Sequence, residues 1–253
     1  MKKYIDKTTK LSNRNYKSIS SDRYKKIIAK AIKNSNFYFL SFKAIDTKNK
    51  KVLHNRLSIS LKGDNNTLYR YNQFISIVQE IDLVNKLYNN LLEFIFKTPD
   101  ESLDGFICSL RLPYNYLVID SNYEVLKEIL NTYQNNLSFE LIIEIPNNFA
   151  YKYIEKTNLY KKLLKKYAIS IAIYEFNLEC NDLNYLKKME PKYIKGDGTY
   201  FISLNKEKLS TFKIITNNLN IDLIATDVKD KEILVELEKN EIYLIQGSII
   251  NSL

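Results

Sequence analysis

The sequence predicts a single α/β barrel. Short apolar or alternating runs rich in Ile, Phe, Tyr and Val recur along the chain, and after the first two runs they alternate with longer segments of helical periodicity. No linker rich in Pro, Gly or Ser divides the 253 residues, so one main domain is expected. An open doubly wound sheet is the alternative. It usually has a glycine-rich turn after its first strand, and none is present here.

The elements follow in order. The runs FYFLSFKAI (37–45) and VLHNRLSISL (52–61), joined by the polar DTKNKK, predict an antiparallel hairpin. The later strands are expected at 105–112, 138–146, 168–176, 192–197, 221–226 and 242–247. The helices are expected at 70–96, 121–135, 148–166, 181–189, 203–218 and 229–240.

Function in such a barrel lies at the carboxyl ends of the strands, so polar residues that interrupt the apolar runs there are the candidates. They are Arg56, Arg111, Glu144, Tyr174, Glu175, Lys195, Asp197, Thr226 and Gln246. Asp197 lies between Gly196 and Gly198, a pattern typical of a turn or a cap and, less often, of a phosphate-binding loop.

The net charge of +9 is concentrated at the amino terminus. Residues 1–35 carry eleven Lys or Arg against Asp6 and Asp22, and the rest of the chain carries 27 basic and 27 acidic residues. We therefore expect a basic arm over 1–20 and a charge-neutral barrel over 21–253 that does not bind nucleic acid. The arm itself is either a solubilising lead-in helix or a contact for RNA, anionic lipid or an acidic partner.

Cysteine and histidine are scarce. The chain has Cys108, Cys180 and a single histidine, His54. This composition excludes a disulfide scaffold and a structural zinc site, and it argues against Cys/His or Ser/His catalysis. His54 is expected to be structural. No transmembrane run or signal peptide is recognisable, which predicts a cytoplasmic location.

Three segments carry a family resemblance. EPKYIKGDGTYF (190–201) is similar to P-x-D-x-x-K-I-D-x-x-F, and IDLIATDVKDKEILVELEKNEIYLIQG (221–247) is similar to V-I-A-E-G-V-E running on to Q-G. FISIVQEIDLV (74–84) is similar to F-I-x-x-A-E-x-x-G-L-I. Together they resemble the EAL family of cyclic di-GMP phosphodiesterases over roughly residues 20–253, which implies a modified (β/α)8 barrel with an antiparallel first strand. DKTTKLSNR (6–14) also resembles the start of a diguanylate cyclase (GGDEF) domain.

The resemblance implies that much of the family's metal site is replaced. The metal-ligating glutamate of Glu-Ala-Leu falls on Arg56, the arginine that follows it on Ser60, and a ligand asparagine on Arg111. An aspartate pair falls on Tyr174 and Glu175, and a further glutamate on Thr226. Glu144, Lys195, Asp197 and Gln246 match the family pattern.

These residues are compatible with three functions. The first is a catalytically inactive EAL-like domain, without metal or cofactor, that serves as a protein-interaction module in a signalling assembly. The second is a metal-free receptor for cyclic di-GMP or another anion, held by Arg56, Arg111, Lys195 and Gln246. The third is a residual phosphodiesterase. For the first we expect Arg56 or Arg111 to pair with Glu144 or Glu175, and Asp197 to act as a cap.

Overall fold

The computed structural model describes residues 4–5, 21–63, 66–97, 103–133, 136–178 and 182–252. Most of the predicted arm, the segment DKTTKLSNR and Cys180 lie outside the described residues. The chain forms two compact units. The first comprises Met1–Ser41, Leu57–Gly105 and Asn115–Phe139, and the second comprises Phe42–Arg56, Phe106–Tyr114 and Glu140–Leu253.

The strands form the predicted barrel. They are β2 (Phe37–Asp46), β3 (Lys51–Lys62), β5 (Ile107–Arg111), β6 (Glu140–Pro146), β7 (Ser170–Tyr174), β8 (Tyr193–Asp197), β9 (Asp222–Thr226) and β10 (Leu244–Gln246). Their order is β2-β10-β9-β8-β7-β6-β5-β3, and β2 also pairs with β3, which closes the sheet. From β5 to β10 each pair of neighbouring strands is parallel, whereas β2 is antiparallel to β10. The modified barrel with an antiparallel first strand is thus confirmed.

Short strands and helices complete the two units. The first unit contains β1 (Tyr4–Ile5), β4 (Leu68–Arg70), α1 (Ser21–Lys33), α2 (Tyr71–Glu80), α3 (Val84–Lys97) and α5 (Asp120–Tyr133). The second contains α6 (Asn147–Lys152), α7 (Ile154–Lys166), α8 (Asn184–Met189), α9 (Gly198–Ser203), α10 (Lys206–Asn218), α11 (Lys231–Lys239) and the 3-10 helix η3 (Ser248–Ser252). The short α4 (Tyr114–Leu117) lies where the two units meet in sequence.

Two of the predicted helices are each divided in two, and a third begins later than expected. The helix expected at 70–96 is interrupted where Asp82 adopts a left-handed φ of 51°. The helix expected at 148–166 breaks at Tyr153, whose φ of −122° and ψ of 54° are not helical. The helix expected at 203–218 instead begins at Lys206 as α10, after the cap Asn205, whose side chain accepts a hydrogen bond from the Lys208 amide at 2.8 Å.

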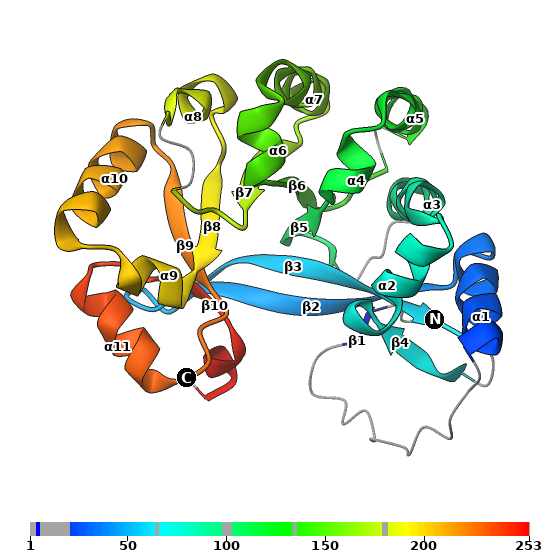
Figure 1. Ribbon diagram of the computed structural model, residues 1–253, viewed down its shortest axis with the longest axis horizontal. Coiled ribbons are helices and arrows are strands. Elements are labelled where there is room, and N and C mark those ends of the chain that lie inside the picture. Colours follow the sequence, from blue (N-terminus) through cyan, green and yellow to red (C-terminus); the bar gives the residue numbers. More distant parts are fainter. Residues whose placement is uncertain are drawn as a thin grey trace. The chain divides into compact units, whose positions relative to one another are not determined.

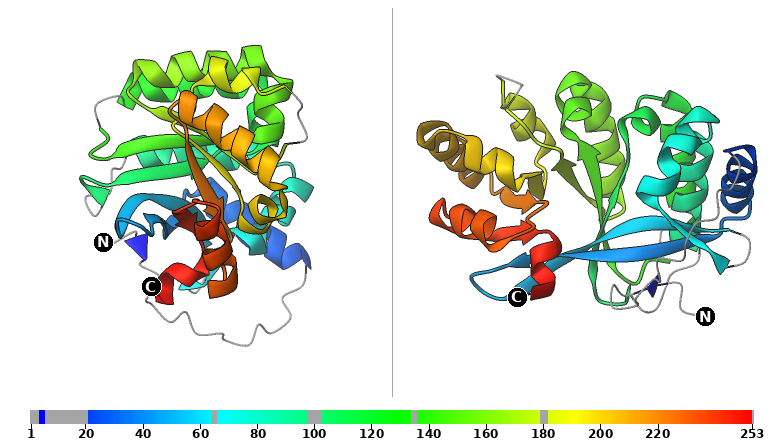
Figure 2. Two further views of the ribbon diagram at one scale, coloured as in Figure 1. Left: turned by 90° about the vertical axis from the view of Figure 1, so that its left-hand side faces the viewer. Right: turned by 60° about the horizontal axis from the view of Figure 1, so that its bottom comes forward.

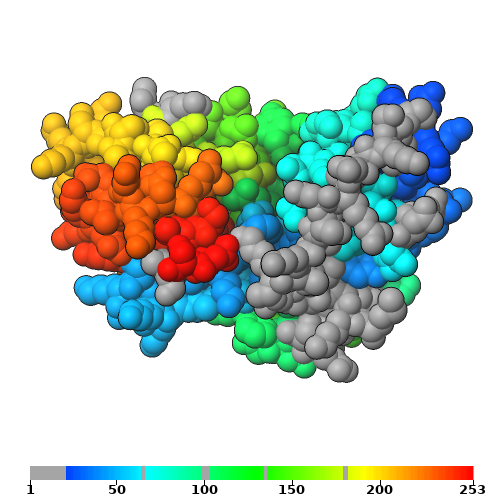
Figure 3. Space-filling model, turned by 90° about the horizontal axis from the view of Figure 1, so that it is seen from below, coloured from blue at the N-terminus to red at the C-terminus, as the bar shows by residue number. Residues whose placement is uncertain are grey.

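The helices of the second unit pack on the outer side of its strands. In Figure 1, α6, α7, α8 and α10 lie outside β6 to β9, and Figure 2 shows α10 beside β9. At the carboxyl end, η3 lies beside α11 (Figure 3). Gly247 precedes η3 and must be glycine, because an added Cβ would lie 2.0 Å from the Val228 carbonyl oxygen. No helix among the described residues is both long and apolar enough to cross a membrane.

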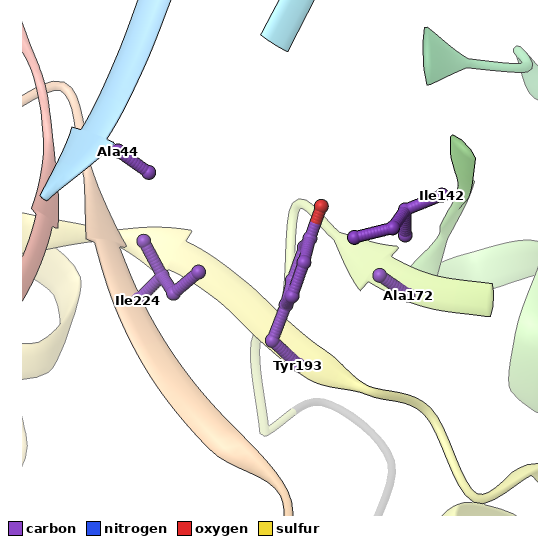
Figure 4. Packing of buried hydrophobic residues seen from close by; sticks show 5 residues of the cluster. All are labelled: Ala44, Ile142, Ala172, Tyr193 and Ile224. Atoms are coloured by element: carbon purple, nitrogen blue, oxygen red, sulfur yellow. The ribbon is translucent and has the colours of Figure 1, made fainter. Parts of the chain in front are cut away.

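An apolar layer fills one level of the barrel interior in the second unit. Its members come from five strands, and the Tyr193 ring stands between the others (Figure 4); they are Ala44, Ile142, Ala172, Tyr193 and Ile224. Because side chains alternate along a strand, the next residue on the same face comes two positions later. Glu144, Lys195 and Thr226 occupy those positions on β6, β8 and β9, so the candidate site forms the next level.

Candidate functional site

Glu144 is the centre of the candidate site. Its side chain is 0% exposed and accepts hydrogen bonds at Oε1 from Lys195 Nζ at 2.5 Å, Ser109 Oγ at 2.6 Å and the Tyr193 hydroxyl at 3.1 Å. Arg111 Nε donates to the other oxygen, Oε2, at 3.0 Å. Both oxygens of this buried carboxylate are therefore engaged by protein donors.

The strand register brings these groups together. β5 and β6 are parallel with Arg111 directly opposite Glu144, and Ser109 lies on the same face of β5 two residues earlier. On β8, Tyr193 and Lys195 likewise lie two residues apart on one face of the strand. Burial by itself raises the pKa of Glu144, but the positive charges of Lys195 and Arg111 outweigh that effect and hold the pKa well below the ordinary carboxyl value. Glu144 is ionised at neutral pH.

Lys195 links Glu144 to β10. Its side chain is 0% exposed, and Nζ also donates to Gln246 Oε1 at 3.1 Å. The Gln246 amide in turn donates from Nε2 to the Phe42 carbonyl oxygen at 2.9 Å, which fixes its orientation. Burial lowers the pKa of Lys195 to about 8, although Glu144 acts in the opposite direction. The candidate residues Lys195 and Gln246 therefore form a connected buried chain with Glu144.

Arg111 lies between this buried chain and solvent. Its side chain is 32% exposed, and its guanidinium carbon lies 4.6 Å from the centre of the Tyr174 ring. The Tyr174 hydroxyl donates to the Leu112 carbonyl oxygen at 3.4 Å. Burial lowers the pKa of Arg111, but the adjacent carboxylate of Glu144 raises it more. The predicted arginine–carboxylate pair is therefore present, formed by Arg111 and Glu144.

Arg56 differs from Arg111. It lies on β3, the neighbour of β5 in the sheet, and its guanidinium carbon is 4.7 Å from the centre of the Phe42 ring. Its Nε is buried and has no hydrogen-bond partner among the described residues. Burial and the charge of Arg111 lower the pKa of Arg56 to about 10, so it remains positive at neutral pH. Among the residues that the structure describes, no carboxylate forms an ion pair with it.

The remaining candidates lie at the strand ends and do not join the Glu144 network. Glu175 follows β7, is exposed and has a left-handed φ of 54°. Asp197 caps α9 and accepts hydrogen bonds from the Thr199 amide at 2.8 Å and the Thr199 hydroxyl at 2.5 Å, which confirms the predicted cap. The Thr226 hydroxyl donates to the Gly196 carbonyl oxygen at 3.1 Å.

His54 packs against the site without a hydrogen bond to it. Its ring stacks on Tyr193 with a centroid distance of 4.6 Å and an angle of 6°. His54 Nε2 is 4.0 Å from Glu144 Oε1 and, within the described part of the chain, has no hydrogen-bond partner. Burial and the charge of Lys195 lower the pKa of His54 to about 3, so the ring is neutral at pH 7.

Sequence reasoning missed Ser109, Tyr193 and Phe42. Ser109 and Tyr193 donate to Glu144, and Phe42 contributes both a ring beneath Arg56 and a carbonyl oxygen to Gln246. A signal existed for the first two, since each lies two residues before a predicted site residue on the same strand. Phe42 had none, because β2 is antiparallel and its register with β10 is not visible in the sequence.

The donor set does not fit a divalent metal. The family resemblance implies metal ligands here, and a hard cation such as Mg²⁺ needs several oxygen ligands. Both Glu144 oxygens already accept from cationic side chains, Lys195 and Arg111. Across the described residues no three His, Cys, Asp or Glu side chains gather in a group that could hold a metal ion.

Comparison with known proteins establishes the family. The EAL domain matches residues 25–252, so the chain belongs to the EAL domain family. Cyclic di-GMP phosphodiesterase PdeA of Borreliella burgdorferi is 26% identical over 236 residues, which cover 87% of this chain and 34% of that protein. The chain thus spans about a third of the length of this curated relative.

Solved structures share the fold. Vibrio cholerae LapD S helix-GGDEF-EAL bound to c-di-GMP has a TM-score of 0.74 at 19% identity, covering 94% of this chain and 59% of that one. The Xanthomonas citri FimX EAL domain in complex with c-diGMP has a TM-score of 0.71 at 14% identity, covering 90% and 92%. At identities of 19% and 14%, this structural similarity shows a shared fold only.

Proposed function

We propose that this chain is a catalytically inactive EAL domain that serves as a regulatory or protein-interaction module in cyclic di-GMP signalling. The observation that carries the proposal is the occupation of Glu144 by Lys195 and Arg111. Family membership and the similarity to PdeA support the signalling context. A protein partner and a cytoplasmic location remain predictions within the same proposal.

Metal-assisted hydrolysis of a phosphodiester requires a cation that binds the phosphate and activates a water. A cation at Glu144 would have to displace a buried ammonium and a guanidinium from the only fully buried carboxylate that the structure describes. Arg56 adds a third positive charge nearby and stays protonated at ordinary pH. The local charge therefore opposes metal binding.

The test is hydrolysis of cyclic di-GMP by the purified chain with Mg²⁺ or Mn²⁺. We expect no turnover above the rate of a protein-free control, with the Glu144→Gln variant giving the same background rate. Metal-dependent turnover in the unaltered chain that disappears in Glu144→Gln would overturn the proposal, because it would show that Glu144 does hold a catalytic metal.

A second candidate function is a metal-free receptor for cyclic di-GMP. It is favoured by the excess of positive charge at the site, where Arg56, Arg111 and Lys195 face a single buried carboxylate, Glu144. Two structural relatives, LapD and FimX, were solved with c-di-GMP bound. Calorimetric titration with cyclic di-GMP, with and without Mg²⁺, separates the two functions. Tight binding without Mg²⁺ supports the receptor, and the absence of heat supports the interaction module.

A further inference from the structure

A cleft lies at the amino-terminal ends of β7 and β8, on the outer side of these strands. It has a volume of about 260 Å³ and opens between the carboxyl ends of α7 and α8, which pack side by side (Figure 1). Its lining comes from residues within 161–171 and 189–192, all in the second unit, and we call it the lysine cleft. Tyr174 of the candidate site lies at the opposite end of β7, so the two sites are separate.

The floor of the lysine cleft is apolar. It is formed by Ile169, Ile171 and Met189, all of which are buried. Ala172 points into the barrel interior, so Ile171, one residue earlier on β7, points outward toward the helices. Ile169 lies two positions before Ile171 on the same face, and Met189 is the last residue of α8. An apolar side chain that entered the cleft would therefore meet an apolar surface.

Two lysines of the rim are held in place by neighbouring groups. Lys161 on α7 pairs with Glu190 at 2.8 Å, and it also donates to the Lys188 carbonyl oxygen at 2.8 Å. Lys192, which precedes β8, pairs with Glu140 at the start of β6. These contacts fix two ammonium groups beside the apolar floor.

Lys165 is the open cation of the rim. It lies one turn after Lys161 on α7, on the same face of the helix, and its side chain is exposed. Within the described part of the chain it makes no hydrogen bond or ion pair. The lining carries three lysines against one carboxylate, Glu190, whose pKa is lowered by the hydrogen bond from Lys161 and further by the charge of Lys165. The cleft is therefore positive overall.

Helix capping explains only part of this arrangement. Lysines in the last turn of a helix interact favourably with its dipole, which accounts for Lys165 and Lys166 on α7 and for Lys187 and Lys188 on α8. Lys161 lies before the last turn of α7, and the dipole gives no reason for an apolar cavity beneath the lysines. The combination of floor and rim calls for a ligand that has both apolar and acidic groups.

The dimensions and chemistry of the lysine cleft favour one kind of occupant. Its volume is below the roughly 300–1,000 Å³ of sites that enclose a whole small molecule, and suits a single apolar side chain. Its described lining contains no arginine, the usual fork for phosphate, and no aromatic ring on which a nucleobase could stack. Charge complementarity to the lysines then selects carboxylates beside the apolar group.

We propose that the lysine cleft binds an acidic peptide segment of a protein partner. One apolar side chain of the segment lies on Ile169, Ile171 and Met189, and carboxylates on either side of it meet Lys165 and the fixed ammonium groups of the rim. The proposal rests on the proposed function, because it gives the surface and the partner chemistry of that interaction module. A buried apolar anchor surrounded by a charged rim is the usual arrangement of such contacts.

The first experiment titrates the full chain into a fluorescent peptide, acetyl-Glu-Asp-Glu-Leu-Glu-Asp-Glu-amide, and follows its anisotropy. We expect saturable binding at one site. Replacing the central leucine by serine should weaken binding about tenfold, because the leucine leaves water on binding. Replacing the acids by Gln and Asn should weaken it at least tenfold. Equal affinity of the leucine and serine peptides, or no saturable binding of the acidic peptide, would overturn the proposal.

A charge reversal within the cleft locates the binding. Lys165→Glu should weaken binding of the leucine peptide at least tenfold. Lys166→Glu is the matched control, because it makes the same change in the same turn of α7 but does not line the cleft, and it should weaken binding less than threefold. Equal losses would mean that the peptide senses only diffuse charge, and would reject the cleft. If Lys165→Glu does not fold by circular dichroism, Lys165→Met and Lys166→Met provide the same comparison.

Two further measurements test other occupants. If an oligouridine binds the unaltered chain more tightly than the peptide does and Lys165→Glu abolishes its binding, the ligand is a nucleic acid and the proposal is wrong. If sedimentation shows a dimer that Lys165→Glu dissociates, the occupant is a second copy of the chain, which also contradicts a separate partner. Hydrolysis of cyclic di-GMP does not involve the cleft, so failure of peptide binding and failure of the proposed inactivity can be told apart.

Discussion

Two adjacent levels of the barrel interior in the second unit differ sharply in chemistry. The lower level is apolar, with Ile142, Tyr193 and Ile224 packed together (Figure 4). Two residues further along β6 and β8 lie Glu144 and Lys195, which are equally buried but charged. The same strands thus build both levels, and the change occurs over a single step of side-chain alternation.

The difference shows how each level is stabilised. Apolar burial is nondirectional, so the lower level depends on volume and tolerates swaps of similar size. The upper level depends on pairing, because an ion that loses its partner keeps its desolvation cost. Substitutions should therefore be far more damaging in the upper level when they remove one member of a pair than when they remove both.

The largest expected effect is that of Lys195→Met. It leaves Glu144 fully buried without its closest cation, and we expect the free energy of unfolding to fall by about 3 kcal/mol in urea titrations. The double variant Glu144→Gln with Lys195→Met should recover much of that loss. Lys192→Met, which breaks a surface pair with Glu140, is the matched control and should cost less than about 1 kcal/mol.

A loss no greater for Lys195→Met than for Lys192→Met would contradict this view of the upper level. It would mean that Arg111, Ser109 and Tyr193 satisfy Glu144 without the lysine.

The next effect is a dependence of stability on pH that arises from His54. The pKa of His54 is about 3 in the folded chain, whereas the ordinary value of 6.5 applies to the unfolded chain. Between these two pH values the unfolded chain binds a proton at His54 that the folded chain does not bind. The contribution of neutral His54 to the free energy of unfolding is fully present above pH 6.5. It is lost progressively as pH falls toward 3, by up to about 1.4 kcal/mol per pH unit.

Urea titrations between pH 4.5 and 7 measure this slope. His54 is the only histidine, and above about pH 5.5 carboxyl groups are ionised in both the folded and the unfolded chain, so the slope in that upper part of the range can be assigned to His54. His54→Phe keeps a ring to stack on Tyr193 but cannot be protonated, and should flatten the slope. An unchanged slope in His54→Phe would show that other groups, Glu144 and Lys195 among them, dominate this titration.

The smallest effect is expected at Asp197, outside the buried network. Asp197→Ala removes the cap of α9 and should lower the free energy of unfolding by about 1 kcal/mol. Asn205→Ala, which uncaps α10 in the same way, is the matched comparison. If Asp197→Ala lowers the free energy of unfolding several times more than Asn205→Ala does, then Asp197 also supports the level of Glu144 and is more than a helix cap.

The sequence by itself determined the barrel and which polar residues lie toward the carboxyl ends of its strands. Alternating apolar runs and helical segments give the strand order, and the carboxyl ends of parallel strands must share one edge. Glu144, Lys195 and Gln246 could therefore be expected to meet, and they do. The cap at Asp197 was likewise visible from its local pattern, because capping is a contact between near neighbours in the chain.

Only the tertiary structure decided which arginine pairs with Glu144. Arg56 and Arg111 are equivalent by sequence, yet Arg111 lies opposite Glu144 in the β5–β6 register while Arg56 stacks on Phe42. The roles of Ser109 and Tyr193 as donors, and the helix breaks at Asp82 and Tyr153, were decided in the same way. Strand register and helix breaks depend on packing between distant segments, and the local pattern does not record that packing.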